Sequence, residues 1–147
     1  LQLEIPDRLR AILRYDPNLS HRLYAAADLL LIPSRYEPCG LAQMIAMRYG
    51  TLPVGRATGG LRDTIVDDNN PYTSTGFLFQ NPQSEELAAT LRRAIQVFPN
   101  RRAWRAMQRN AMNQDFSWTR SAREYLRVYQ EVVQEKLHYS VSKGVLL

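Results

Sequence analysis

Short apolar runs alternate with stretches of helical spacing along this chain, and that alternation limits the folds that it can adopt. The clearest run is residues 29–32, which lies between Asp28 and Pro33 and is typical of a buried parallel strand. Residues 52–54 and 77–79 have the same character, and residues 41–49 between the first two runs have the spacing of a helix. The pattern predicts an α/β fold with a parallel sheet and helices on its faces.

The rest of the chain is predicted as one more strand, at residues 9–15, and four more helices. The first of these helices, residues 20–27, is expected to be capped near Asn18 or Ser20. The other three are expected at residues 84–98, with Ser84 as the cap, 101–112 and 119–137. The last helix carries an apolar stripe that is typical of core packing.

Length and composition exclude several classes of protein. The 147 residues are enough for one domain with a sizeable core. Cys39 is the single cysteine, so no internal disulfide is possible, which suits a reducing compartment. We expect no secretory signal and no membrane partner, because no apolar run approaches the ~20 residues that a membrane helix needs.

The most informative stretch is residues 34–43, which follows the apolar run and opens a helix. Ligands of parallel α/β sheets bind at the carboxyl ends of the strands. The Glu37 carboxylate there can accept hydrogen bonds from sugar hydroxyls, and N–H groups near Gly40 and Leu41 are expected to be free for an anion. The alternative is that Glu37 is a solvated loop acid or an acid at a helix start.

A glycine pair follows the second apolar run, at Gly59 and Gly60. Two glycines allow main-chain N–H groups to crowd around a phosphate oxygen, with Arg56 and Arg62 at the flanks. Most glycine pairs are ordinary turns, which is the alternative here. No P-loop lysine accompanies the pair, so ATP hydrolysis is not indicated.

Several motifs together resemble the C-terminal domain of bacterial glycogen synthases and plant starch synthases. They are HRLYAAAD at 21–28, EPCGL at 37–41 with Gln43, YGTLP at 49–53, TGGLRDT at 58–64, TGFLF at 75–79 and FSW at 116–118. One departure concerns Ile45, because many related retaining enzymes have a second Glu eight positions after the first. Together with Gln43, that departure favours glycogen synthases over sucrose-type relatives, and it leaves open which residue holds the ribose.

The resemblance implies a Rossmann-like domain that is the C-terminal half of a GT-B fold, with a helical C-terminal segment. It implies a retaining transfer of glucose from ADP-glucose, with UDP-glucose the less expected donor, to the 4-hydroxyl end of an α-1,4-glucan. The implied roles are Glu37 at the donor glucose as the catalytic residue, Cys39, Gly40 and Leu41 at the sugar and phosphate, Thr58, Gly59, Gly60 and Leu61 at the diphosphate, and Tyr15 on the adenine ring. A half-buried strand tyrosine is the alternative for Tyr15.

The resemblance also implies a division of the chain. Residues 1–115 are expected to form the nucleotide-sugar-binding domain without its N-terminal part, residues 116–138 a helix that packs back on the fold, and residues 139–147 a tail. The glucan acceptor would bind through an N-terminal domain that this chain lacks. We therefore expect the chain alone to bind donor weakly and to transfer no glucose, in a protein of the bacterial cytoplasm or a plastid.

The alternative function is a non-catalytic nucleotide-sugar or polyanion-binding module, because the net charge is +5. Six arginines cluster without an acid between them: Arg92, Arg93, Arg101, Arg102, Arg105 and Arg109. No aromatic interleaving or nucleic-acid motif accompanies them, so a solvated helix face is preferred and no nucleic-acid partner is expected. His21 and His138 are isolated, so no metal site is expected, and no cofactor is expected either.

Overall fold

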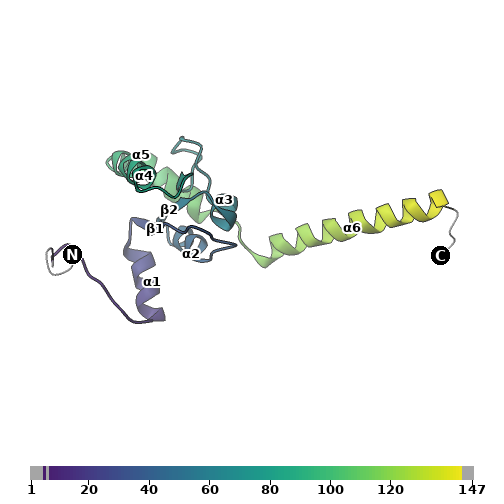
Figure 1. Cartoon of the computed structure of the whole chain (residues 1–147), viewed down its shortest axis with the longest axis horizontal. Helices are drawn as coiled ribbons and strands as arrows, with labels where there is room; N and C mark the ends of the chain where they lie inside the picture. Colours follow the sequence, from purple (N-terminus) through teal and green to yellow (C-terminus); the bar gives the residue numbers. More distant parts are fainter. Residues whose placement is uncertain (1–4, 6, 144–147) are drawn as a thin grey trace. The chain divides into compact units, whose positions relative to one another are not determined.

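Three parallel strands form the sheet, in the order β1, β2, β3. Figure 1 labels β1 and β2 together with the helices. The strands are β1 at Leu29–Ile32, β2 at Leu52–Arg56 and β3 at Phe77–Phe79. Leu29 lies opposite Leu52, and Val54 lies opposite Phe77. The three apolar runs therefore form the predicted parallel sheet.

The computed structural model describes residue 5 and residues 7–143, the last seven of these by their backbone only. The helices of the described residues are α1 at Pro17–Ala26, α2 at Ala42–Arg48, α3 at Gly59–Thr64, α4 at Ser84–Val97, α5 at Arg101–Met112 and α6 at Trp118–Lys143. The chain divides into two units: the first ends at Met112, and the second begins at Asn113 and contains α6. No described helix is long and apolar enough to span a membrane.

The core of the first unit lies around the central strand β2. Four of its five residues are buried, and α2, α4 and α5 all pack against it. Trp104 of α5 fills the largest space, with Phe98 edge-on at 5.0 Å and Phe77 stacked at 6.4 Å between ring centroids. Burial of such aromatic groups supplies much of the hydrophobic stabilisation of a domain.

The strand predicted at residues 9–15 is absent: this segment has no regular secondary structure. Leu13 is 99% exposed. A strand requires a ladder of hydrogen bonds to a neighbour, and no described strand pairs with these residues. Apolar spacing alone is therefore not sufficient to make a strand here.

The predicted start of the first helix was wrong by three residues. Asp16 is the N-cap of α1, and its Oδ1 accepts a hydrogen bond of 3.0 Å from the N–H of Leu19. Pro17 occupies the first helical position, where its missing N–H costs nothing. At α4, Ser84 is already inside the helix and the N-cap is Gln83.

The second unit was predicted well in type but not in length. Its helix, α6, continues to Lys143, beyond the expected end at residue 137. Tyr125, Leu126 and Tyr129 on its apolar stripe are more than half exposed. Packing of this helix on other parts of a protein remains a prediction, and residues 144–147 of the expected tail lie outside the described residues.

Candidate functional site

Two loops leave the carboxyl ends of neighbouring strands. Residues 33–41 connect β1 to α2, and residues 57–58 connect β2 to α3. Because Ile32 lies opposite Gly55 in the sheet, both loops begin at the same edge. The structure therefore brings the Glu37 loop and the glycine pair together, at the edge where parallel sheets bind ligands.

The two loops touch through the glycine pair. A side chain on Gly59 would place its Cβ 2.0 Å from the carbonyl oxygen of Glu37, and one on Gly60 would lie 1.7 Å from that of Cys39. The N–H of Gly60 donates to the carbonyl oxygens of Glu37, at 3.0 Å, and of Pro38, at 3.2 Å. The pair is therefore more than a turn, because its backbone is the surface on which the Glu37 loop rests.

Gln43 holds the same loop from the first turn of α2. Its side chain is 0% exposed, and its Nε2 lies 3.0 Å from the carbonyl oxygens of Cys39 and of Gly40 and 3.2 Å from Oγ1 of Thr64. The sequence had marked Gln43 only as a family feature. The available signal was a glutamine on a helix whose other buried residues are apolar.

The backbone N–H groups of Cys39, Gly40, Leu41 and Gly59 have no hydrogen-bond partner among the described residues, and neither do those of residues 34–37 earlier in the loop. Cys39, Gly40 and Leu41 are consecutive, and their loop rests on the glycine pair. Unpaired N–H groups in a row form a concave site for anions and hydroxyl oxygens. The helix α2 has only seven residues, so we attribute the site to the loop peptides and not to a helix dipole.

Glu37 is half-buried at the outer side of this row. The Ser34 hydroxyl donates to its Oε2 over 3.1 Å. The Arg56 guanidinium, which the sequence places beside the glycine pair, donates from Nε to the carbonyl oxygen of Ser34 over 3.0 Å and from Nη2 to that of Arg35. Arg56 thus fixes the start of the loop that carries Glu37.

The predicted diphosphate residues differ in what they can offer. The Leu61 side chain is buried in the core, and its N–H donates to the carbonyl oxygen of Thr58 over 3.1 Å. The N–H of Thr58 is likewise paired, with the carbonyl oxygen of Arg56. Of the four predicted diphosphate residues, Gly59 alone has a backbone N–H without a partner among the described residues. The roles of Thr58, Gly60 and Leu61 at a diphosphate remain predictions.

Tyr15 belongs to neither of the two loops. Its side chain is 91% exposed, in the segment just before α1, so it is not the half-buried strand tyrosine of the alternative. The far end of α1 is tied to the sheet by the Thr51 hydroxyl, which contacts the carbonyl oxygens of Tyr24 and, at 2.7 Å, of Ala27. An exposed ring is available to stack on a base, and that role of Tyr15 remains a prediction.

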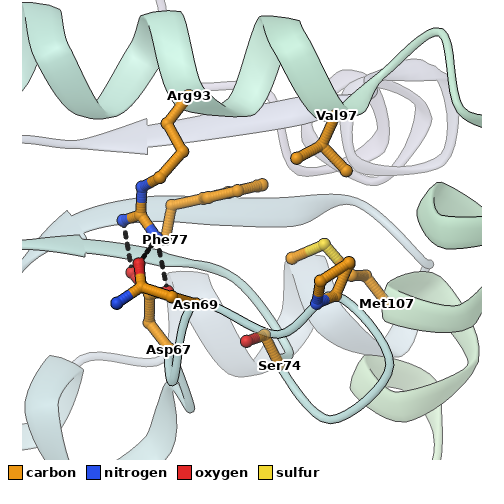
Figure 2. Close-up of a pocket in the computed structure, with 8 residues that line it drawn as sticks. Asp67, Asn69, Ser74, Phe77, Arg93, Val97 and Met107 are labelled. Carbon is orange, nitrogen blue, oxygen red and sulfur yellow. Dashed lines mark hydrogen bonds and ion pairs between the residues drawn. The ribbon is translucent and has the colours of Figure 1, made fainter.

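A hollow of about 110 Å³ lies at the opposite, amino end of β3 (Figure 2). Arg93 and Asp67 close one side of it with a bidentate ion pair of 2.7 Å and 2.5 Å, and Asp67 is only 6% exposed. This pair raises the pKa of the Arg93 guanidinium, chiefly through the hydrogen bond to Asp67. The sequence suggested that Arg93 is a solvated arginine, and this was wrong. Its charge is already neutralised by Asp67.

A second hollow, of about 210 Å³, lies between α1 and the amino ends of the first two strands. Its lining is Ser20, Leu23, Tyr24, Ala27, Leu30 and Thr51. The lining is mostly apolar and holds no charged side chain. Neither hollow coincides with the predicted donor site, which is an open edge of loops. Among the described residues, no three His, Cys, Asp or Glu side chains gather to hold a metal ion.

One group of exposed arginines shares one side of α5. Four are exposed there, namely Arg101, Arg102, Arg105 and Arg109, and α5 contains no acid. Residues 1–83 carry eight basic and eight acidic side chains, whereas residues 84–112 carry six arginines and two glutamates. The excess positive charge of the first unit therefore lies on α4 and α5.

Comparison with known proteins gives consistent matches. The glycogen synthase of Desulfitobacterium hafniense is 47% identical over 141 residues, which cover 92% of this chain and 28% of that protein. The glycogen synthase of Anaeromyxobacter sp. is 48% identical over 129 residues, 88% of this chain and 27% of that protein. The chain thus spans little more than a quarter of the length of these curated relatives.

Solved structures give the same result for the fold. The catalytic domain of starch synthase IV from Arabidopsis thaliana, bound to ADP and acarbose, matches with a TM-score of 0.78 and 40% identity over 90% of this chain and 28% of that one. A sucrose-phosphate synthase from Thermosynechococcus elongatus matches with a TM-score of 0.64 and 25% identity over 91% of this chain and 32% of that one. The predicted resemblance and the Rossmann-like, GT-B type of fold are confirmed.

A family model covers most of the chain. The model of the glycosyl transferases group 1 matches residues 1–111. That range contains β1, β2 and β3 and both loops of the candidate site. The chain therefore belongs to the glycosyl transferases group 1 family.

Proposed function

We propose that this chain forms the donor-binding part of a retaining glucosyltransferase. The enzyme would move glucose from ADP-glucose to the 4-hydroxyl end of an α-1,4-glucan, as in glycogen or starch synthesis. The observation that carries the proposal is the row of unpaired N–H groups at residues 39–41, next to the Glu37 carboxylate. The names of the relatives, and the ADP bound to the starch synthase IV catalytic domain, support the same choice.

Glucose transfer would require the protein to stabilise the negative charge on the departing nucleoside diphosphate. Fixed N–H groups aimed at the position where that charge develops do so without reorganisation. In this proposal Cys39, Gly40, Leu41 and Gly59 donate to sugar and diphosphate oxygens, while Glu37 accepts hydrogen bonds from glucose hydroxyls. The acceptor 4-hydroxyl would attack the same face of the sugar that the diphosphate leaves.

The base would be recognised by stacking. The exposed Tyr15 ring can cover one face of adenine, worth roughly 1–3 kcal/mol by analogy with single-stranded nucleic acids. Stacking is tolerant of the base, so UDP-glucose remains the second donor of the proposal. The likeness to glycogen and starch synthases supports the bacterial cytoplasm or a plastid as the location.

Calorimetric titration of the 147-residue chain with ADP, UDP and a short single-stranded oligonucleotide tests the proposal. We expect weak binding of ADP, weaker binding of UDP, and a loss of roughly tenfold in ADP affinity for Tyr15→Ala. Since the chain spans little more than a quarter of its relatives, we expect no glucose transfer by the chain alone. An ADP affinity that Tyr15→Ala leaves unchanged, together with an ADP-glucose affinity that Glu37→Gln leaves unchanged, would contradict the proposed site.

The arginines of α5 favour one alternative, a polyanion-binding module. Arg101, Arg102, Arg105 and Arg109 share an exposed side of α5, and Arg101 also lies 4.8 Å above the Phe98 ring. Binding of the oligonucleotide but not of ADP, abolished by Arg105→Gln with Arg109→Gln, would support this alternative over the donor site.

A further inference from the structure

We propose that Gln43 is a positioning residue of the donor site, whose buried amide orients the N–H groups that meet the ligand. The ligand role of those N–H groups rests on the proposed function, but their orientation does not. Gln43 touches no atom that would react. Its contacts are with the backbone of Cys39 and Gly40 and with Thr64.

Peptide geometry gives the first step. In a planar trans peptide the C=O and the N–H point in opposite directions, and no described residue has a cis peptide bond. The carbonyl of Cys39 shares its peptide with the N–H of Gly40, and the carbonyl of Gly40 shares its peptide with the N–H of Leu41. Gln43 Nε2 holds both carbonyls at 3.0 Å from the buried side of the loop. The N–H groups of Gly40 and Leu41 must therefore point away from the core.

The preceding peptide is held in the same way by another group. The N–H of Gly60 lies 3.2 Å from the carbonyl oxygen of Pro38, whose peptide carries the N–H of Cys39. Three consecutive peptides thus have their carbonyls paired on the inner side. Their three N–H groups are left without partners among the described residues. Because Cys39 and Leu41 are exposed, these N–H groups are accessible to a ligand.

The Gln43 amide uses its nitrogen to hold the loop, and its own oxygen is left unpaired by the described residues. Its Oε1 is buried and has no hydrogen-bond partner among the described residues, which is destabilising. Exchanging the amide oxygen and nitrogen would not help, because the oxygen would then face the two carbonyl oxygens that Nε2 now binds. The site therefore keeps an unpaired acceptor in order to donate twice to the loop, which is difficult to explain by stability alone.

Gly40 gives the Gln43 amide the space that it needs behind the loop. Its φ of +71° lies in the left-handed region, and a Cβ there would come 2.5 Å from Gln43 Oε1. The glycine thus allows the turn and leaves room for the amide behind it. Thr64 supports the amide from α3, since its Oγ1 lies 3.2 Å from Nε2 and donates to the carbonyl oxygen of Gly60. Gln43 therefore connects the two loops of the site.

Gln43→Met in the 147-residue chain is the main test, because methionine keeps an unbranched side chain of similar length without a donor. Gln108→Met is the matched control: Gln108 Nε2 also donates to a glycine carbonyl, that of Gly50, over 2.9 Å, but at the other end of α2. We expect Gln43→Met to lower ADP affinity at least about tenfold, and Gln108→Met to leave it unchanged. Calorimetric titration with ADP measures both.

Amide N–H dipolar couplings supply a readout that a purely structural role would not move. We expect the Gly40 and Leu41 vectors to reorient in Gln43→Met and to stay in place in Gln108→Met. Reorientation in a chain that binds no ADP would refute the proposed function while supporting the role of Gln43. Unchanged vectors and unchanged ADP affinity would overturn the inference.

A measurement on the unaltered chain covers the case in which Gln43→Met does not fold. Scalar couplings across hydrogen bonds should connect the Gln43 side-chain nitrogen to the carbonyl carbons of Cys39 and Gly40. Their presence would support the inference, and their absence would overturn it.

Discussion

Two loops of the first unit, residues 33–41 and 67–76, look alike in composition but treat their polar groups in opposite ways. Both contain an acid, a glycine and short polar residues, and both adjoin a strand of the same sheet. The loop at 67–76 lies before the amino end of β3, and the loop at 33–41 follows the carboxyl end of β1.

The loop at 67–76 pairs its polar groups within the fold. Asp68 accepts hydrogen bonds from the hydroxyls of Thr73, at 2.5 Å, and Ser74, at 2.7 Å, and from the N–H of Asn70. Asp67 is bound by Arg93 and by the N–H of Leu78. Its charges and donors are therefore used for stability.

The loop at 33–41 pairs its carbonyls and leaves its donors free. Gln43 and Gly60 hold the carbonyls of residues 38–40, while the N–H groups of residues 39–41 have no partner in the described chain. The difference teaches that a binding loop is recognised by where its unpaired groups lie, and composition does not reveal this.

The largest expected effect comes from a clash placed in each loop. Gly60→Ala puts a Cβ 1.7 Å from the carbonyl oxygen of Cys39, so the loop must move, and we expect a loss of roughly a hundredfold in ADP affinity. Gly76→Ala is the matched control, because its Cβ would lie 2.7 Å from the carbonyl oxygen of Pro53 near the other loop. It should lower the melting temperature and leave the ADP affinity of the folded chain intact. Equal losses of ADP affinity for the two variants in calorimetry would show that the loop at 33–41 is no more important for binding than the loop at 67–76.

The ion pair of the structural loop should matter for stability alone. Asp67→Asn weakens the bidentate pair with Arg93, which is 32% exposed, so we expect about 2–3 kcal/mol less free energy of unfolding, below the value for a fully buried pair. Urea denaturation measures this effect. A change of ADP affinity beyond twofold would show that the two loops are coupled.

Replacing the acid of the binding loop should lower ligand affinity and leave stability nearly unchanged, the opposite of the result expected for Asp67→Asn. Glu37→Gln keeps the size of the side chain but removes a charge that would accept bonds from glucose hydroxyls. We expect about tenfold weaker binding of ADP-glucose, with binding of ADP and the free energy of unfolding nearly unchanged. Competition between the two ligands measures the ratio. Equal weakening for both ligands would show that Glu37 does not act through the sugar.

The smallest effect is a pH dependence confined to the structural loop. Hydrogen bonds from Thr73, Ser74 and Asn70 lower the pKa of Asp68 from 3.8 to about 2. A lowered pKa in the folded state stabilises the fold above the unfolded pKa, and this stabilisation disappears as the pH falls from about 4 to about 2. The free energy of unfolding should thus fall more steeply over that range in the wild type than in Asp68→Asn. Parallel curves for the two proteins would show that these hydrogen bonds do not favour the charged form in solution.

Much of the fold follows from the sequence because local patterns decide it. The runs at 29–32, 52–54 and 77–79 form β1, β2 and β3, because the backbone groups of neighbouring strands form hydrogen bonds with one another. The segment at 9–15 has a similar local pattern and no partner strand among the described residues, which no local pattern can reveal. The start of α1 was also misplaced, because Asp16 competes with two other cap residues nearby.

The candidate site was predicted in its location but not in its construction. Motif order places Glu37 and the glycine pair on adjacent strand ends, and the structure joins them. The roles of Gln43 and Arg56 depend on hydrogen bonds to backbone carbonyls, which follow from the folded loop and not from residue type. Arg93 was misjudged for the same reason, because its partner Asp67 lies 26 positions away.

A titration of the isotope-labelled chain with ADP, followed by the amide resonances, tests the central claim most directly. We predict that the largest shifts fall on Cys39, Gly40, Leu41 and Gly59, whose N–H groups have no partner among the described residues and lie where the two loops meet. Shifts centred on the arginines of α5 or on residues 67–76, with these four amides unmoved, would contradict the claim.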